Sequence, residues 1–192
     1  MKIRILTLIL LCLPLLSHAE TSAWNEQVLM EALAQVKTSQ GKFSESKFLS
    51  MLNRPIESSG TLSFHAPGHL EKHTLSPKVE SLVLDEGVLT IDSKSRNIKR
   101  TLVLQEYPAV WSIVESIRST LAGDLPTLQR FYKIQVDGSQ AQWKMKLLPI
   151  ERQTREVIRE IRITGKGGRV LSVETFESNG DHALMKVTPD TP

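Results

Sequence analysis

Three histidines at intervals of four residues are the first candidates for chemistry in this chain. His65, His69 and His73 lie in the stretch HAPGHLEKH, and this spacing on a helix would put them on one face. Pro67-Gly68 separates the first two, and a proline inside a helix costs about 3 kcal/mol. On a strand, His69 and His73 would share a face but lie roughly 13 Å apart, too far for two metal–nitrogen bonds of about 2 Å to one ion. We therefore expect no metal site in this stretch.

Catalytic signatures are also weak. No serine lies in a Gly-x-Ser-x-Gly elbow, and the GKGG run at 165–168 lacks the spacing of a phosphate-binding loop. A hydrolase acting on lipid esters stays open as an alternative, with His69 or His182 beside Asp85 or Asp181 serving a serine. We expect no catalytic residues, no cofactor and no enzymatic activity.

The N-terminal segment has the composition of a secretory signal peptide. Lys2 and Arg4 precede an apolar run from Ile5 to Leu16, and Ser17-His18-Ala19 supplies the small residues that signal peptidase accepts. We expect residues 1–19 to be a signal peptide that is cleaved after Ala19. Cys12, the single cysteine, would leave with it, so the mature protein must fold without disulfides.

Charge balance argues against a nucleic-acid partner. The chain has 24 basic and 21 acidic residues, and removing Lys2 and Arg4 leaves a net charge of +1. A nucleic-acid-binding protein would be expected to carry a larger basic excess. Beyond the signal, no stretch is long and apolar enough to cross a membrane. We expect one domain over residues 20–187, followed by a flexible tail at 188–192.

Helical spacing occurs in two regions. Residues 22–38 place Leu29, Leu33 and Val36 on one face. The stretch YPAVWSIVESIRSTLAG has Pro108 near its start, Gly123 at its end and an apolar stripe between them, and a further helical turn can follow in DLPTLQRF. These patterns predict helices that must bury apolar surface.

The rest of the chain alternates apolar and polar residues between turn signals, which predicts eight to ten short antiparallel strands. A strand is expected over 42–53, and Asp85-Glu86-Gly87 predicts a hairpin turn. Such a sheet would be large and curved, with a helix across its concave face. The expected inward rows include Ala141, Trp143, Met145 and Leu147; Val157, Arg159, Ile161 and Ile163; and Ile98, Leu102 and Leu104, interrupted by Arg100.

A series of spaced apolar, proline and glycine positions runs along the chain from residue 43 onward. It comprises Phe43-x-Glu45-x-Lys47, Ser59-Gly60-x-Leu62-x-Phe64-x-Ala66-Pro67-Gly68, Leu70-Glu71-Lys72-x-Thr74-x-x-Pro77, Leu84-Asp85-Glu86-Gly87 with Leu89-Thr90-Ile91, Leu121-Ala122-Gly123-Asp124, Trp143-x-Met145-x-Leu147-x-Pro149 and Asn179-Gly180-Asp181. On these residues the chain resembles the LolA-like family of periplasmic lipoprotein carriers, and the resemblance covers nearly the whole mature chain. The C-terminal portion is similar to a branch whose members often accompany machinery that exports lipids or acylated pigments.

This resemblance implies an α+β fold, an incomplete antiparallel β-barrel with helices covering the concave face. It further implies a periplasmic monomer that binds acyl chains of a lipoprotein or lipid in a hydrophobic cavity and hands it towards the outer membrane. The partners would be an inner-membrane donor complex and an outer-membrane acceptor. The alternative is a non-catalytic periplasmic adaptor protein for a membrane lipid or pigment exporter, whose sheet is filled by side chains.

The candidates for the cavity wall follow from the inward rows and the apolar helix: Phe64, Leu82, Leu84, Leu102, Val110, Ile113, Ile117, Trp143 and Met145. Arg100 is a possible contact for a lipid head group or for the lid. In the typical carrier that this chain resembles, an arginine stands immediately before the proline that corresponds to Pro67, and this arginine bonds to the helical lid. Here Ala66 stands at that position. The three histidines would lie on the outside or the rim of the sheet.

Overall fold

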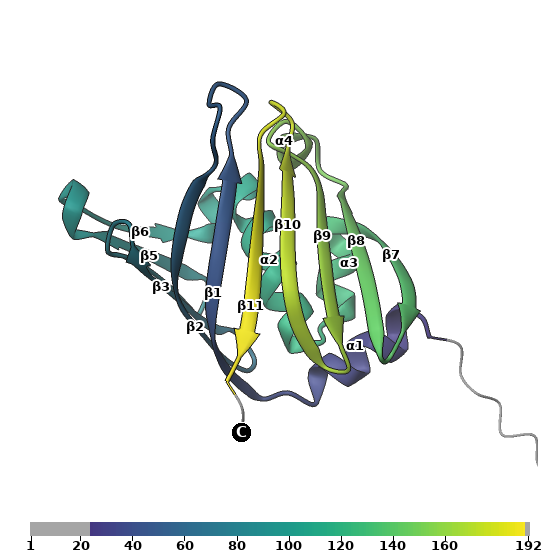
Figure 1. Cartoon of the computed structure of the whole chain (residues 1–192). Helices are drawn as coiled ribbons and strands as arrows, with labels where there is room; N and C mark the ends of the chain where they lie inside the picture. Colours follow the sequence, from purple (N-terminus) through teal and green to yellow (C-terminus); the bar gives the residue numbers. More distant parts are fainter. Residues whose placement is uncertain (1–23, 191–192) are drawn as a thin grey trace, which may run out of the picture.

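A computed structural model describes residues 24–190, which form an α+β fold with one large sheet (Figure 1). The predicted signal peptide at 1–19 lies outside the described residues. The helices are α1 (Glu26–Ala34), α2 (Pro108–Ala122), α3 (Leu125–Phe131) and α4 (Arg152–Arg155), with 3-10 turns at Lys94–Arg96 and Leu104–Glu106. The strands are β1 (Thr38–Phe48), β2 (Ile56–His65), β3 (His69–Ser76), β4 (Glu80–Asp85), β5 (Val88–Ser93), β6 (Ile98–Val103), β7 (Tyr132–Ser139), β8 (Gln142–Pro149), β9 (Ile158–Lys166), β10 (Arg169–Glu177) and β11 (His182–Pro189).

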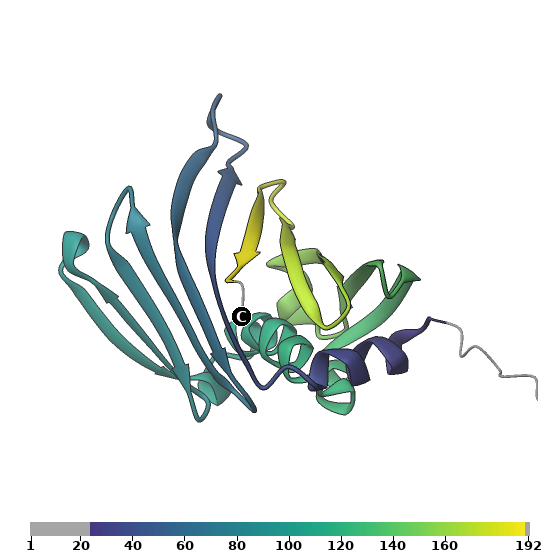
Figure 2. The same cartoon turned by 60° about the horizontal axis from the view of Figure 1, so that its bottom comes forward.

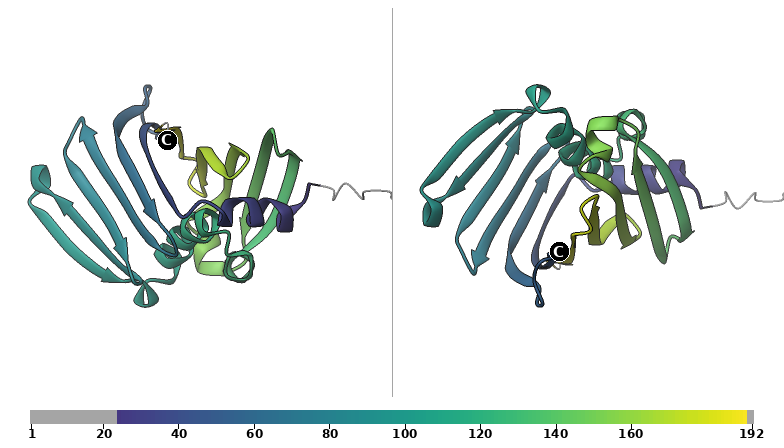
Figure 3. Two further views of the ribbon diagram at one scale, coloured as in Figure 1. Left: turned by 90° about the horizontal axis from the view of Figure 1, so that it is seen from below. Right: turned by 90° about the horizontal axis from the view of Figure 1, so that it is seen from above.

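The eleven strands pair antiparallel in the order β6-β5-β4-β3-β2-β1-β11-β10-β9-β8-β7. β11 returns to lie between β1 and β10, and so joins the first strands to the last ones. β6 and β7 are the two edges of the sheet and do not pair with each other. Figures 2 and 3 show the sheet curving around α2. The expected incomplete antiparallel β-barrel with helices on its concave face is confirmed.

Local sequence signals set the ends of the helices. Asn25 caps α1, because its side chain accepts a hydrogen bond from the backbone N–H of Val28 at 3.0 Å. α2 starts at Pro108, where the missing N–H of proline costs nothing. It ends at Gly123, whose φ is +68°. A Cβ at this glycine would overlap the carbonyl oxygen of Met30, so the glycine also allows α1 to approach closely.

The hydrophobic core lies on one half of the sheet, where α1 and α3 pack on β7, β8 and β9. Trp143 is fully buried there, and its indole Nε1 donates a hydrogen bond to the carbonyl oxygen of Gly167 at 2.8 Å. The remaining core residues are Leu29, Met30, Leu33, Leu128, Phe131, Tyr132, Met145, Leu147, Ile158, Ile161 and Ile163. In residues 24–190, no helix is long and apolar enough to cross a bilayer.

Three sequence expectations about the strands are corrected. The strand expected over 42–53 is β1, which ends at Phe48; residues beyond it form a loop in which Met51 is 85% exposed. A β-bulge opposite Phe176 and Glu177 breaks the alternation expected in β9, so that Ile158 and Ile161 are both buried while Arg159 is exposed. Thr188 and Pro189, which were expected in the flexible tail, pair with β1, and residues 191–192 of the expected tail lie outside the described residues.

Candidate functional site

A cavity of about 740 Å³ lies between the concave face of the sheet and α2. Its lining is mainly apolar. Strands β1 to β5 supply it from one half of the sheet, strands β9 to β11 from the other half, and α2 from across the opening. Cross-strand partners share a face of the sheet, and the register places Leu62, Lys72 and Leu82 in one row across β2, β3 and β4. The wall therefore continues across neighbouring strands.

α2 presents apolar side chains to this cavity and buries much of its polar face. Ser112, Ser116 and Ser119 are each at most 1% exposed and follow the helical repeat. The small serines let α2 contact α1 and α3, and Ser116 also borders the cavity. Ile113 and Ile117 are half-buried; they line the cavity and pack against the edge of the core. A helix usually buries its apolar stripe more deeply than its polar face, whereas other side chains cover the apolar stripe of α2 only in part.

Hydrogen bonds made by the hydroxyl groups offset the cost of burying these polar side chains. The Ser112 hydroxyl donates to the phenol oxygen of Tyr132 at 3.1 Å, and the Tyr132 hydroxyl donates to the Ser112 carbonyl at 3.1 Å. Thr120 Oγ1 donates to the Ser116 carbonyl at 2.6 Å. Burial also raises the pKa of Tyr132 above its ordinary value. The buried hydroxyl groups therefore have partners, which removes most of the penalty of burying them.

Five of the nine predicted wall residues line the cavity. Phe64 and Leu84 are buried at its base, while Leu82, Ile113 and Ile117 are half-buried. They come from β2, β4 and α2, and the cavity brings them together from residues far apart in sequence. Whether lipid touches them stays a prediction.

The other four predicted wall residues lie elsewhere. Trp143 and Met145 are at most 1% exposed and belong to the core, together with residues of α1 and α3. Leu102 faces the concave side, opposite Leu89, but it sits on edge strand β6 beyond the lining. Val110 lies in the first turn of α2, away from the lining. Alternation identified the inward face for these strand residues, but it could not identify which part of that face a helix covers.

Several lining residues were not singled out from the sequence. Their signals were present, because each continues an alternating row or the apolar stripe of α2. They are Leu62, Leu70, Leu89, Val114, Leu121, Ile161, Ile163, Val173, Met185 and Val187.

The charged contact in the cavity comes from β1 and β3, and Arg100 is not part of it. Lys72 Nζ lies 2.8 Å from Glu45 Oε2, and the Ser58 hydroxyl donates to the same oxygen at 3.2 Å. Lys72 Nζ also lies 4.8 Å from the centroid of the Phe43 ring. Glu45 and Lys72 line the cavity, whereas Arg100 is exposed on β6. Lys72 interrupts an apolar row only across the strands, between Leu62 and Leu82, so this signal comes from the register of the sheet and not from the sequence of β3.

Arg118 ties α2 to the turn between β2 and β3. Its Nη1 donates to the Pro67 carbonyl at 3.1 Å, its Nε to Glu115 Oε2 at 2.7 Å, and its Nη2 to Asp124 Oδ2 at 3.0 Å. Burial opposes the charge, but the hydrogen bonds that it donates to Glu115 and Asp124 raise the pKa of Arg118. Arg118 thus joins α2 to the turn in which Ala66 precedes Pro67.

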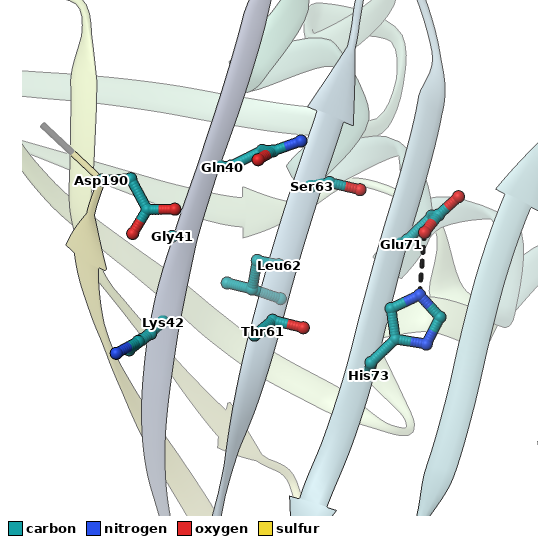
Figure 4. A pocket seen from close by; sticks show the side chains of 9 residues that line it. All are labelled: Gln40, Gly41, Lys42, Thr61, Leu62, Ser63, Glu71, His73 and Asp190. Atoms are coloured by element: carbon teal, nitrogen blue, oxygen red, sulfur yellow. Dashed lines mark hydrogen bonds and ion pairs between the residues drawn. The ribbon is translucent and has the colours of Figure 1, made fainter. Parts of the chain in front are cut away.

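The three histidines lie on the outer face of the sheet, as expected. His69 Nε2 and His73 Nε2 each lie 2.8 Å from a carboxylate oxygen of Glu71, and His69 Nδ1 lies 3.2 Å from Asp85 Oδ1. Glu71 and His73 border a shallow polar hollow of about 310 Å³ on this face (Figure 4). Over residues 24–190, no group of three or more histidine, cysteine or acidic side chains is arranged to hold a metal ion. His69 has carboxylates and no serine among its hydrogen-bond partners in the described chain.

Comparison with solved structures finds distant similarity over most of the chain. A LolA superfamily protein from Nitrosomonas europaea is 9% identical, with a TM-score of 0.44 over 88% of this chain and 96% of that one. LprF from Mycobacterium bovis is also 9% identical, with a TM-score of 0.35 over 87% and 93%. A chain of the MucA/MucB complex of Pseudomonas aeruginosa is 14% identical, with a TM-score of 0.45 over 85% of this chain and 55% of that one. This chain therefore spans about half the length of the matched chain.

A search of the curated proteins found no match. The model of the family described as outer membrane lipoprotein carrier protein LolA-like matches residues 18–187, which is nearly all of the chain that the structure describes. The chain belongs to this LolA-like family.

Proposed function

We propose that this protein is a periplasmic carrier that binds acyl chains of a lipoprotein or lipid in its cavity and hands them towards the outer membrane. The observation that carries the proposal is the unfilled cavity of about 740 Å³ with apolar side chains on both walls. Pockets that hold small ligands measure about 300–1,000 Å³. Ile117 on α2 and Leu82 on β4 are half-buried, so a bound chain would cover apolar surface that is now uncovered.

The energetics of acyl chains explain why such a cavity is useful. Burying one methylene group contributes about 0.8 kcal/mol, so a sixteen-carbon chain is worth on the order of 12 kcal/mol. A chain held this strongly would not pass through water on a useful timescale. A carrier must therefore shield it in transit and release it directly into a receiving protein or membrane.

The pair of Lys72 and Glu45 supplies polar atoms within a mainly apolar wall. An anionic group next to the acyl chains, such as a carboxylate or phosphate, can replace Glu45 as the partner of Lys72. The Phe43 ring and the Ser58 hydroxyl already hold these two side chains in place. We therefore assign head-group contact to Lys72.

Export, a donor complex in the inner membrane, an acceptor at the outer membrane and a monomeric state are parts of the same proposal. They are supported by the family, whose description is that of a carrier protein, and by the signal-like N-terminus. We propose a binding function without catalysis. The adaptor alternative expects side chains to fill the whole concave face, and the cavity favours the carrier over it.

Native mass spectrometry of protein recovered after export tests the proposal, followed by titration with a fluorescent fatty acid. We expect co-purifying lipid and saturable binding of the probe. Leu82→Gln should weaken probe binding about tenfold, because it places an amide against the chain. Leu171→Gln is the matched control, since Leu171 also lies on a strand, is exposed and does not line the cavity. Bare protein that binds no acyl probe would overturn the proposal.

A further inference from the structure

Exposed apolar side chains gather at one end of the sheet. We call it the upper end; it carries the connections β1–β2, β8–β9 and β10–β11, which lie at the top of Figure 1, and the connections β3–β4 and β5–β6, which the twist of the sheet carries to the left of that view. Among residues 24–190, eleven large hydrophobic side chains are exposed, and eight of them lie at this end. These are Phe48, Met51, Leu52, Ile56, Leu75, Val79, Ile150 and Val157. Exposed apolar residues that cluster in this way commonly mark a contact surface.

The β1–β2 loop projects furthest from the upper end (Figure 1). Met51 and Leu52 are 85% and 47% exposed at its tip, and Phe48 and Ile56 flank it at 38% and 46%. The backbone N–H of Ser50 donates to Asp181 Oδ1 at 2.8 Å, which fastens this loop to the β10–β11 turn. The loop therefore presents apolar side chains from a held position and does not fold them back onto the protein.

The connections at the upper end carry an excess of cationic residues. They contain six cationic residues and three acidic ones: Arg54, Lys78, Lys94, Arg96, Arg152 and Arg155, against Glu151, Glu156 and Asp181. At the lower end, Glu86 is the one charged residue within the β2–β3, β4–β5, β7–β8 and β9–β10 connections, and Lys37, Lys166 and Arg169 lie at the strand ends beside them. Arg96 pairs with Glu80, and Arg152 with Glu156. The other four cations have no ion-pair partner in the described part of the chain.

We propose that the upper end docks on the surface of an anionic lipid bilayer, with Met51 and Leu52 inserted below the head groups. Apolar side chains at the tip of a projecting loop, with cations beside them, match the boundary between acyl chains and anionic head groups. A protein partner would more usually meet a packed patch with aromatic anchors at its centre. Here half of the exposed apolar side chains belong to the projecting β1–β2 loop and the rest to the β3–β4 and β8–β9 connections, and long cationic side chains such as Arg54 and Lys78 can reach the head groups beside them.

The purpose of this docking depends on the proposed carrier function. Glu45 lines the cavity, and Phe48 lies three residues further along β1, so the base of the loop is about 10 Å from the cavity wall. A docked upper end would thus bring the cavity close to the bilayer. Acyl chains could then move between cavity and membrane over a short path.

The test uses exported protein with its N-terminus verified by mass spectrometry, because a retained leader would itself bind lipid. Met51→Cys is labelled with an environment-sensitive fluorophore and mixed with vesicles of phosphatidylcholine, with or without phosphatidylglycerol. Cys12 is the single cysteine and belongs to the expected leader, so the label reports one site. We expect a blue shift with the anionic vesicles. Val103→Cys, at the lower end, is the matched control and should show none.

Sedimentation with the same vesicles measures the affinity. The double variant Met51→Ser/Leu52→Ser should partition at least tenfold less, and Arg54→Gln/Lys78→Gln about tenfold less on anionic vesicles only. Val103→Ser/Leu171→Ser should partition like the wild type. Equal binding by the tip and control variants would overturn the proposal. The proposal would also be overturned if the wild type bound no vesicles while the Met51→Cys variant cross-linked through residue 51 to a membrane protein.

Fatty-acid titration of the same variants keeps the two proposals apart. The tip variants leave the cavity wall unchanged and should bind the acyl probe as the wild type does. Failure to bind vesicles with normal probe binding would overturn the docking and leave the carrier function standing. Vesicle binding without any probe binding would support the docking and overturn the carrier function.

Discussion

The two halves of the sheet use the same alternating pattern for different purposes. Under β7, β8 and β9, the inward side chains meet α1 and α3 and form a core in which Trp143 is fully buried. Under β2 to β5, inward side chains such as Leu82 face a cavity instead. The difference lies in how many helices cover each half, and not in the strand sequences. A row of apolar residues therefore reports a face of a sheet, and the covering elements decide whether that face is filled.

The largest contrast between the halves should appear on truncating one inward residue from each. Trp143→Ala would leave a large void in a packed region and should lower the free energy of unfolding by about 3–5 kcal/mol. Leu82→Ala enlarges a cavity that already exists, so its cost should be about 1 kcal/mol. Urea denaturation of both variants measures the difference. Equal losses would show that the two halves are packed alike.

A smaller contrast should appear between the two faces of α2. Ser112→Leu forces a large side chain into a buried position outside the cavity wall and should cost about 1–3 kcal/mol. Ile113→Ser, one position further along, removes apolar surface from the cavity wall and should cost less stability but weaken acyl binding. Thermal unfolding and fatty-acid titration of each variant separate the two effects. If Ser112→Leu proved harmless and Ile113→Ser unfolded the protein, the assignment of the two faces would be wrong.

Arg118 sharpens the comparison by testing how firmly α2 is held over the open half. Arg118→Met removes the hydrogen bond to the Pro67 carbonyl and leaves the buried Glu115 with Ser119 as its remaining hydrogen-bond donor. We expect a loss of about 1–2 kcal/mol, together with faster amide hydrogen exchange in α2. Arg130→Met is the control, because Arg130 is an exposed cation on α3. Unchanged exchange in α2 would argue that packing alone holds the helix.

The smallest effect should come from the outer face, where pH acts on the histidines. Hydrogen bonds to Glu71 and Asp85 raise the pKa of His69 above its ordinary value of 6.5. Its contribution to stability is therefore complete below pH 6.5 and is lost as the pH rises through the raised pKa. Hydrogen bonds to His73 and His69 lower the pKa of Glu71 from 4.5, so its contribution is complete above pH 4.5 and is lost as the pH falls through the lowered value.

Glu71→Gln should bring the pKa of His69 back toward its ordinary value, as measured by NMR titration of the imidazole. Glu174→Gln, on β10 and away from this cluster, should leave that pKa unchanged. The same pKa in Glu71→Gln and in the wild type would mean that Asp85 alone is responsible.

Much of the architecture was predictable from local pattern. Pro108 and Gly123 marked α2 correctly, and Glu86 and Gly87 both have positive φ in the predicted hairpin turn. The strand over 42–53 was extended too far, because Met51 and Leu52 continue the alternation although nothing covers them. The bulge in β9 could not be foreseen, since it arises from pairing with β10 and not from the sequence of β9 itself.

The site was less predictable than the fold. The structure brings Phe64, Leu82 and Ile117 together around one cavity, whereas Trp143 and Met145, expected in the same wall, belong to the core. Whether an inward residue meets a helix or empty space depends on contacts between distant segments. The polar burial on α2 was also missed, because Ser112, Ser116 and Ser119 are read from sequence as a solvent-facing stripe.

Ile113 and Ile117 line the cavity and also pack against the core. Both are half-buried, so cargo that covers their exposed parts adds to the contacts that hold the fold, and a ligand that binds the native state alone raises its melting temperature. A loaded molecule should therefore melt later than an empty one. Heat resistance would then report the cargo status of the protein without any label.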